Sequence, residues 1–207
     1  MTKPLAGILD VGVSNMGAPR RMLDLGGFAT RLVTNANDFK KLDLVVCPGV
    51  SGLDYLICEL KRLKILDSLF EAVSGRGLPY LGICAGLQLL TLGSEETKRE
   101  GLGIIPLKCE KFPSNKERIS PHIGWNTVTL NPSFSLREVS NNWKYKAYFL
   151  HSYAIKTAFE SDLLFQTTNE YEFVSGFKIR NFWAMQFHIE KSQIIGNEIL
   201  TMIRTEL

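Results

Sequence analysis

Hydrophobic positions in the first half of the chain follow two spacings that alternate. Short apolar runs of β-strand length are followed by longer segments in which apolar residues recur every three or four positions. The predicted strands are 5–11, 29–33, 44–47 and 79–83, and the predicted helices are 15–25, 56–73 and 86–92. Strands that alternate with helices predict a parallel sheet with helices on both faces.

The second half has a different pattern, because strands dominate until the last segment of the chain. Strands are predicted at 125–130, 146–153, 163–168, 172–179 and 182–187, and apolar positions from Ile194 to Ile203 predict a closing helix. We therefore expect an α/β fold with a mainly parallel central sheet flanked by helices and an added, mostly antiparallel set of strands. No linker or repeat divides the sequence, so residues 1–207 are predicted to form a single domain.

Composition narrows the class of protein. Hydrophobic residues make up 45% of the 207 residues and charged residues 22%, which is typical of a globular protein. The net charge of +3 comes from scattered basic residues, which argues against a nucleic-acid partner. Residues 77–94 carry no charge, but Pro79 and several glycines favour a buried strand, turn and helix over a membrane span. The first residues indicate an opening strand and not a secretory leader, so we expect a cytoplasmic protein.

The four cysteines are Cys47, Cys58, Cys84 and Cys109, and none belongs to a C-x-x-C pair. Structural zinc is therefore not expected, and we predict neither a metal site nor a cofactor. Cys47, Cys58 and Cys109 are interpreted as structural thiols, because free cysteine is commonly buried.

Cys84 has a different setting, because an apolar strand leads into Gly82-Ile83-Cys84-Ala85-Gly86 and then into an apolar helix. This arrangement predicts a nucleophile elbow with sulfur in place of a hydroxyl, in which the nucleophile has a strained backbone. A position at the start of a helix lowers a thiol pKa. The backbone N–H of Ala85 is then available for a developing oxyanion.

A cysteine nucleophile needs a base, and the sequence offers His122, His151 and His188. His188 follows an apolar strand, and Glu190 two residues later can orient its ring. The alternative is a histidine at the end of a strand followed by a glutamate at a helix start. His151 is the rival base, but without a neighbouring carboxylate it is better interpreted as a substrate-site or structural residue. His122 is a weaker candidate for the base.

These segments resemble a known family. Residues 82–88 and 186–192 are similar to the class I, triad-type glutamine amidotransferases, whose core is flavodoxin-like. Residues 47–50, 121–126 and 148–153 are similar, within that family, to the glutaminase subunits of imidazole glycerol phosphate synthases of histidine biosynthesis. The resemblance covers nearly the whole chain.

The resemblance implies a role for each matching residue. It implies that Cys84 attacks glutamine, that His188 transfers protons, and that Glu190 orients His188. Val50 and Ala85 are implied to supply the oxyanion N–H groups. The residues implied to line the glutamine pocket are Gly49, Gln88, His151, Ser152 and Tyr153.

The resemblance also implies a partner, a (β/α)₈-barrel cyclase or synthase subunit that receives ammonia through a tunnel. Trp125, Tyr148 and Lys191 are implied to lie at that interface. The alternative is that Trp125 and Tyr148 are core aromatics and that Lys191 is a solvated residue at a helix start.

The sequence departs from the family pattern at a few positions. Serines stand at Ser14 and Ser51 where glycine is usual, Ile189 replaces a usual proline, and Ala85 replaces a larger apolar residue. These departures leave open a paralogue that supplies ammonia for amidation of a surface-polysaccharide sugar, and a non-catalytic docking subunit. A different cysteine hydrolase on a similar fold is a further alternative, because elbow cysteines also occur in peptidase-like and chaperone-like α/β proteins.

Overall fold

The computed structural model describes residues 2–12, 16–49, 52–112, 121–134, 144–158, 162–169 and 171–207. Three positions singled out in the sequence, Ser14, Val50 and Ser51, lie outside these ranges.

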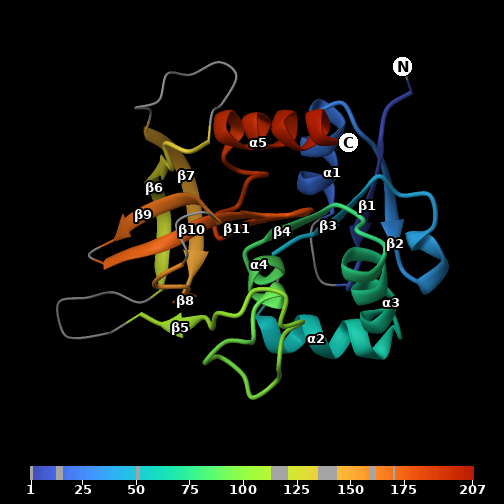
Figure 1. The fold of residues 1–207 in the computed structure, drawn as a ribbon, viewed down its shortest axis with the longest axis horizontal. Helices are drawn as coiled ribbons and strands as arrows, with labels where there is room; N and C mark the ends of the chain where they lie inside the picture. The colour runs from blue at the N-terminus through green and yellow to red at the C-terminus, as the bar shows by residue number, and fades with distance from the viewer. Residues whose placement is uncertain are drawn as a thin grey trace.

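A nine-stranded sheet with the order β2-β1-β3-β4-β11-β10-β9-β6-β7 forms the centre of the described structure (Figure 1). The five strands from β2 to β11 pair in parallel. They are β1 (Leu5–Leu9), β2 (Ala29–Val33), β3 (Leu44–Cys47), β4 (Tyr80–Ile83) and β11 (Phe182–Met185). β3, β4 and β11 are buried along their whole length, as expected for strands covered on both faces.

The remaining strands of this sheet pair antiparallel with their neighbours. They are β6 (His122–Leu130), β7 (Lys144–His151), β9 (Leu163–Asn169) and β10 (Tyr171–Ile179). β5 (Glu110–Lys111) and β8 (Tyr153–Ala154) form a separate two-stranded pair. The predicted architecture, a parallel core with an added antiparallel set, is confirmed, and both sets belong to one continuous sheet.

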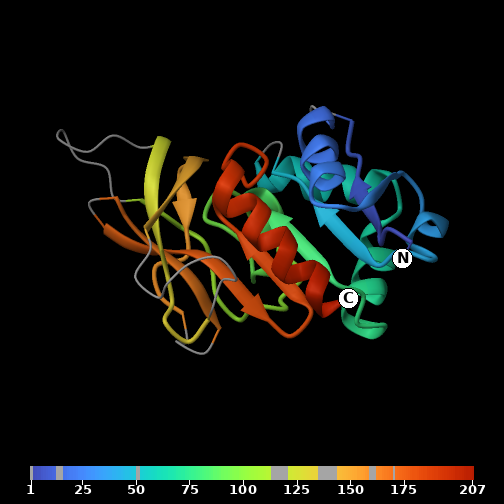
Figure 2. The same cartoon turned by 90° about the horizontal axis from the view of Figure 1, so that it is seen from above.

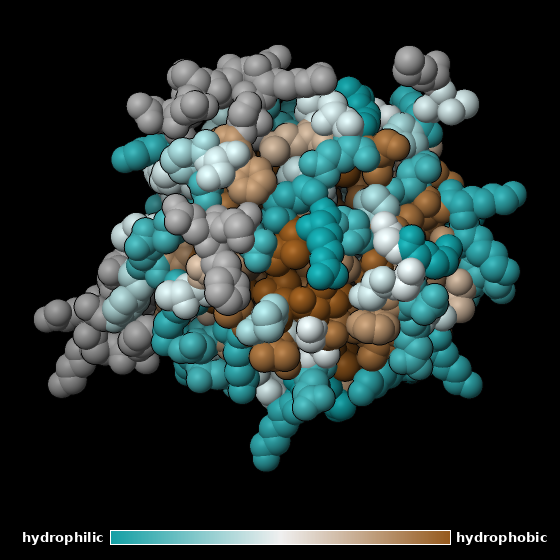
Figure 3. Space-filling view, in the orientation of Figure 1, coloured by the Kyte–Doolittle hydropathy of each residue, from teal (hydrophilic) through white to brown (hydrophobic). Residues whose placement is uncertain are grey.

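Helices cover both faces of the parallel part (Figures 1 and 2). The apolar sides of α1 (Gly17–Leu25) and α5 (Gln193–Glu206) pack into one core cluster. Those of α2 (Leu53–Arg62), α3 (Leu66–Phe70) and α4 (Ala85–Leu90) pack into a second cluster, beside a 3₁₀ turn at Ala36–Phe39 and a π-helical turn at Glu71–Gly75. On the face in Figure 3, apolar surface gathers near the middle and hydrophilic side chains surround it.

The helix predicted at 56–73 is wrong in its continuity. α2 ends in a Schellman-type cap, in which Lys64 N–H donates to the Lys61 carbonyl and Ile65 N–H donates to the Leu60 carbonyl, both at 3.0 Å. Lys64 takes a φ of +56°, a conformation usually filled by glycine, so the sequence carried no stop signal. The strand predicted at 146–153 is likewise interrupted at Ser152, between β7 and β8.

The described helices include none that is both long and apolar enough to cross a membrane. The uncharged stretch 77–94 instead contributes β4 and α4, as the sequence predicts.

Candidate active site

Cys84 lies between β4 and α4 with a φ of +50° and a ψ of −105°. A non-glycine residue with positive φ is strained, and the predicted strain at this elbow is thereby confirmed. Backbone hydrogen bonds on both sides hold the residue there. Its N–H donates to the Met185 carbonyl at 2.7 Å, and its carbonyl accepts from Leu87 N–H and Gln88 N–H at 3.0 and 3.2 Å.

Three glycines make this conformation possible by letting backbones approach closely. A Cβ on Gly82 would lie 2.5 Å from the Gly86 carbonyl oxygen, and one on Gly86 would overlap the Cys47 carbonyl oxygen. A Cβ on Gly49 would lie 2.5 Å from the Ile83 carbonyl oxygen and overlap the Cys84 Cβ. These contacts are with backbone or with the nucleophile itself, so larger side chains at these positions would displace the thiol.

His188 and Glu190 meet in the turn that follows β11. The His188 Nδ1 and Glu190 Oε1 atoms are 2.7 Å apart, and both side chains are nearly buried. The chain there is a turn and not extended, because the His188 carbonyl accepts from Lys191 N–H and Ser192 N–H. Ile189 is buried in this turn and leaves the His188–Glu190 contact in place without the usual proline.

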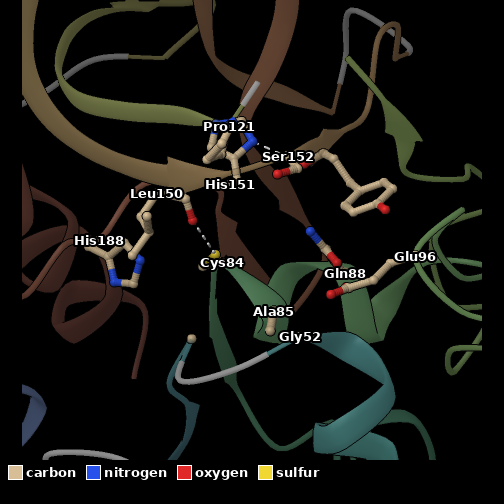
Figure 4. Close-up of a pocket in the computed structure, with 12 residues that line it drawn as sticks. Gly52, Cys84, Ala85, Gln88, Glu96, Pro121, Leu150, His151, Ser152 and His188 are labelled. Carbon is tan, nitrogen blue, oxygen red and sulfur yellow. Dashed lines mark hydrogen bonds between the residues drawn. The ribbon is translucent and has the colours of Figure 1, made fainter. Parts of the chain in front are cut away.

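The ring of His188 faces Cys84 (Figure 4). Burial lowers the pKa of His188, but its hydrogen bonds to Cys84 and Glu190 and the charges of these groups outweigh burial and raise the pKa to about 10. The arrangement favours an imidazolium beside the Cys84 sulfur.

Gln186 also contacts the sulfur, which sequence reasoning missed. Its fully buried side chain places Nε2 3.6 Å from the Cys84 Sγ, as a donor. The Cys84 thiol in turn lies 3.7 Å from the Leu150 carbonyl oxygen, which belongs to β7. Gln186 stands two residues before His188, but no local pattern in the sequence reveals that β11 lies beside β4.

A cavity of about 330 Å³ opens at Cys84, and it contains most of the predicted site residues (Figure 4). Its lining comprises Gly49, Gly52, Cys84, Ala85, Gln88, Glu96, Pro121, Leu150, His151, Ser152, Tyr153 and His188. The structure thus brings together the residues predicted for catalysis and for the pocket. Val50, predicted to supply an oxyanion N–H, lies outside the described residues.

Glu96 lines the pocket and was not among the residues predicted from the sequence. Its Oε2 accepts from Leu53 N–H at 3.0 Å at the start of α2, and it lies with Gln88 across the pocket from His188 (Figure 4). The Oε1 of Gln88 is buried and has no partner among the described residues. The pocket therefore offers a carboxylate and an amide oxygen that can accept hydrogen bonds from a cationic ligand group.

His151 lies in the pocket wall but is unsuited to be the base. Burial lowers its pKa to about 3, against a raising effect of its hydrogen bond to the Tyr153 carbonyl and with further lowering by His122 and His188. Its two ring nitrogens face the Tyr153 carbonyl oxygen at 3.0 Å and the ring of His122 at 3.1 Å. Of the three histidines, His188 has the geometry of a base at Cys84.

The residues predicted for the partner interface form one stack on the outer side of the β6–β7 pair. Trp125 and Tyr148 are cross-strand neighbours whose ring centroids are 5.8 Å apart, edge to face. The Lys191 Nζ lies 4.5 Å from the centroid of the Tyr148 ring. Trp125 is 59% exposed, and nearby Ile123 and Leu150 are also exposed, so Trp125 is not a core residue.

The other cysteines are not part of this site. Cys47 and Cys109 are buried, and burial raises the pKa of each thiol to about 12. Among the residues that the structure describes, no group of three or more His, Cys, Asp or Glu side chains is placed to hold a metal ion.

The sequence is similar to a known protein family and to individual proteins of known name. The model of the family "Glutamine amidotransferase class-I" matches residues 8–202. The imidazole glycerol phosphate synthase subunit HisH 2 of Methanococcus maripaludis is 36% identical over 93% of this chain and 95% of its own length. The subunit HisH of Pyrococcus furiosus is 35% identical over 95% of this chain and 96% of its own length.

Solved structures share the fold at lower sequence identity. A putative GMP synthase subunit from Thermoplasma acidophilum superposes with a TM-score of 0.73 at 19% identity, and covers 100% of this chain and 96% of its own. The structure of PurLQS from Thermotoga maritima gives a TM-score of 0.74 at 17% identity, covering 99% of each chain.

Proposed function

This chain belongs to the class I glutamine amidotransferase family, and we propose that it is the glutaminase subunit of an imidazole glycerol phosphate synthase in histidine biosynthesis. The observation that carries the proposal is the meeting of Cys84, held at positive φ, with the His188–Glu190 pair at one pocket. Relatives that bear this subunit's name match at 30% identity or more over nearly their whole length.

In the proposed reaction, the Cys84 thiolate attacks the side-chain carboxamide carbon of glutamine. The C–N bond then breaks, and His188 gives its proton to the leaving ammonia. Water next hydrolyses the glutamyl thioester, with His188 as the base, so that glutamine and water yield glutamate and ammonia. Glu190 holds the ring of His188 and stabilises its cationic form.

Backbone N–H groups of Val50 and Ala85 are proposed to bind the oxyanion of the tetrahedral intermediate. Gln186 Nε2 lies 3.6 Å from the sulfur and is proposed to stabilise the thiolate before attack.

The far side of the pocket is proposed to recognise the amino-acid end of glutamine. Glu96 and the Gln88 Oε1, which has no partner among the described residues, are placed to accept hydrogen bonds from its ammonium group. Gly49, His151, Ser152 and Tyr153 complete the wall. A pocket that pairs with the ammonium group favours glutamine over simple amides, because a ligand without that group leaves the buried Gln88 Oε1 without a hydrogen bond.

We further propose that the partner is a (β/α)₈-barrel synthase subunit that docks against Trp125, Tyr148 and Lys191. Trp125 is exposed and its ring packs against half-buried Tyr148, and both residue types are enriched among interface hot spots. Leu150 links this surface to the pocket, because the residue is 44% exposed while its carbonyl faces the Cys84 thiol.

The test is to purify the chain together with its synthase partner and to follow glutamate release and imidazole glycerol phosphate formation. With glutamine as the nitrogen source, Cys84→Ala is expected to reduce both rates by roughly 10³-fold or more. With ammonium salt in place of glutamine, the variant and wild-type complexes are expected to form product at the same rate.

The ammonium measurement is the internal control, because it shows that the partner is folded and active. If the Cys84→Ala complex still releases glutamate, Cys84 is not the nucleophile. Release that is normal in the wild type, with no product from the phosphoribosyl substrate, would instead assign the ammonia to another acceptor, such as a sugar.

A further inference from the structure

Two histidines lie side by side at the pocket wall, His151 in the wall itself and His122 next to it, and the proposed reaction uses neither as a base. His122 on β6 and His151 on β7 are directly paired in register, and both point inward. The His122 Nδ1 is 3.1 Å from the His151 Nε2. The other nitrogens are also engaged, His151 Nδ1 with the Tyr153 carbonyl at 3.0 Å and His122 Nε2 with the Asn126 Nδ2 at 3.3 Å.

These side chains form a row of hydrogen bonds that runs from Asn126 to the Tyr153 carbonyl, and the groups at its two ends determine the direction of each bond. The Tyr153 carbonyl can only accept, so His151 carries its proton on Nδ1 and its Nε2 is a lone pair. That lone pair requires a proton on the Nδ1 of His122. The Nε2 of His122 is then also a lone pair and accepts from Asn126.

The Asn126 end fixes the same direction independently. Its Nδ2 also donates to the Thr168 carbonyl at 3.1 Å, and its Oδ1 accepts from Thr127 N–H at 2.7 Å. Both contacts are with backbone groups of fixed polarity, so the amide cannot be turned over without breaking two hydrogen bonds. The path Asn126→His122→His151→Tyr153 therefore has one direction.

The surroundings of the pair favour neutral rings. His122 stacks on Phe149 with centroids 4.6 Å apart, and Phe112 and Phe173 contact both histidines. Burial lowers the pKa of His122 to about 4, and that of His151 to about 3. His188 is the other titratable group that acts on His151, and its positive charge favours a neutral neighbour. A proton added to the Nε2 of His151 would face the N–H of His122, and one added to the Nε2 of His122 would face the amide N–H of Asn126, so neither could form a hydrogen bond there.

This row of hydrogen bonds ends at the part of the pocket wall that is proposed to bind glutamine. His151 reaches over Ser152 to the carbonyl of Tyr153, while the Ser152 carbonyl accepts from Phe112 N–H at 3.1 Å. Both carbonyls that follow His151 are thus anchored, and the break between β7 and β8 takes a fixed shape. His151, Ser152 and Tyr153 all line the cavity.

We propose that His122, held by Asn126, is a positioning residue that fixes the ring of His151 and through it the glutamine-binding turn at Ser152. The proposal rests on the proposed function for its kinetic effect, but the proton positions can be tested without any activity. Losing the donor at His122 frees the ring of His151 and loosens the turn. Glutamine binding should weaken while the chemistry at Cys84 continues.

The direct test is NMR of the full-length chain with ¹⁵N-labelled histidine, at about pH 6 to pH 8. His122 and His151 are both expected as neutral Nδ1–H tautomers throughout this range. Each is assigned by the loss of its signals in His122→Asn and His151→Asn. An Nε2–H tautomer or a charged ring at either residue would overturn the proposal, whether or not the chain proves to be a glutaminase.

The kinetic test compares His122→Ala with His122→Asn in the complex with the synthase partner. Alanine removes the donor, and the KM for glutamine is expected to rise roughly tenfold with kcat changed less than about threefold. Asparagine can place an N–H near the position of the Nδ1, so its KM is expected to return to within about threefold of wild type.

Val128→Ala is the matched control, because Val128 is fully buried on the same side of β6 but is not part of the chain of hydrogen bonds. It should lower the unfolding temperature and leave KM unchanged. If asparagine proves as damaging as alanine, or if Val128→Ala raises KM equally, His122 is an ordinary core residue and the proposal is wrong. Should His122→Ala fail to fold, the tautomers and His122→Asn still decide the question.

Discussion

The nucleophile elbow and the histidine wall hold their functional groups by different means. In the elbow, residues 80–90 with Gly49, the position of Cys84 is set by backbone hydrogen bonds and by glycines packed against other backbone. The histidine wall consists of β6, β7 and the turn 186–192, which is hydrogen-bonded to β7 through Tyr148 and Ser192. There the three histidine rings are set by hydrogen bonds between side chains or from a side chain to a carbonyl.

This difference predicts that the two regions respond to different kinds of substitution. A residue positioned by backbone contacts is displaced by added volume, whatever its charge. A ring positioned by a directional hydrogen bond is displaced by a change in charge or donor pattern, even when the volume stays the same. Substitutions that keep one property and change the other should therefore separate the two regions.

Among the substitutions that separate the two regions, Glu190→Gln is expected to give the largest effect, because it changes charge at nearly constant volume in the histidine wall. It removes the carboxylate that pairs with His188 at 2.7 Å and that helps to raise the pKa of His188. Loss of an orienting carboxylate in a triad costs up to about 10⁴ in kcat, so we expect a fall of at least roughly 10²-fold in glutamate release.

The pKa of His188 provides a second measurement for Glu190→Gln. Without the carboxylate the pKa of His188 should fall, so the ring stays charged over a narrower range and loses its proton at a lower pH. Titration of the ring by NMR would show this directly. Glu59→Gln, which removes the carboxylate of an ion pair on α2, is the control and should change neither quantity. Turnover within twofold of wild type in Glu190→Gln would remove Glu190 from the triad.

Gly86→Ala tests the elbow by adding one methyl group and no charge. The new Cβ would overlap the Cys47 carbonyl oxygen, which is part of β3 and cannot turn away. The free energy of unfolding should fall by up to about 3 kcal/mol, and denaturant melts would measure it. Gly75→Ala is the matched control, because the added Cβ meets only the flexible side chain of Glu71. Equal stability of the two variants would contradict the view that backbone packing fixes the elbow.

Sequence patterns were sufficient for the longer elements of the fold but not for all of their limits, nor for short elements such as β5. Alternating apolar runs predict the parallel core, and the Gly82-to-Gly86 motif predicts the strained Cys84, because both signals are local. The break after α2 was missed, since Lys64 takes a conformation that glycine usually marks.

The site was predictable where residues close in sequence act together, as His188 and Glu190 do. Gln186 and Glu96 were missed, because their places depend on strand order and on the path of the chain after α4. The His122–His151 pair depends on the register of β6 and β7, whose residues are far apart in sequence. Long-range pairing is set by the whole core, so no local pattern reveals it.

The smallest expected effect is on the outer side of the histidine wall, where Trp125 is exposed and does not itself line the pocket. Trp125→Ala should weaken binding of the synthase partner roughly tenfold or more, because truncating an aromatic interface anchor costs at least about 1–2 kcal/mol. Titration calorimetry with the purified partner would measure the change in Kd. Phe70→Ala, at another exposed aromatic position on α3, should leave Kd unchanged.

Trp125→Ala also separates the two sides of β6. Trp125 points outward while its neighbour Asn126 holds His122, so at saturating partner the KM for glutamine should stay at its wild-type value. Partner binding that is unaffected by Trp125→Ala would place the interface elsewhere. A raised KM at saturating partner would mean that the outer face and the hydrogen-bonded histidines act as one unit, and the distinction between docking surface and pocket wall would be lost.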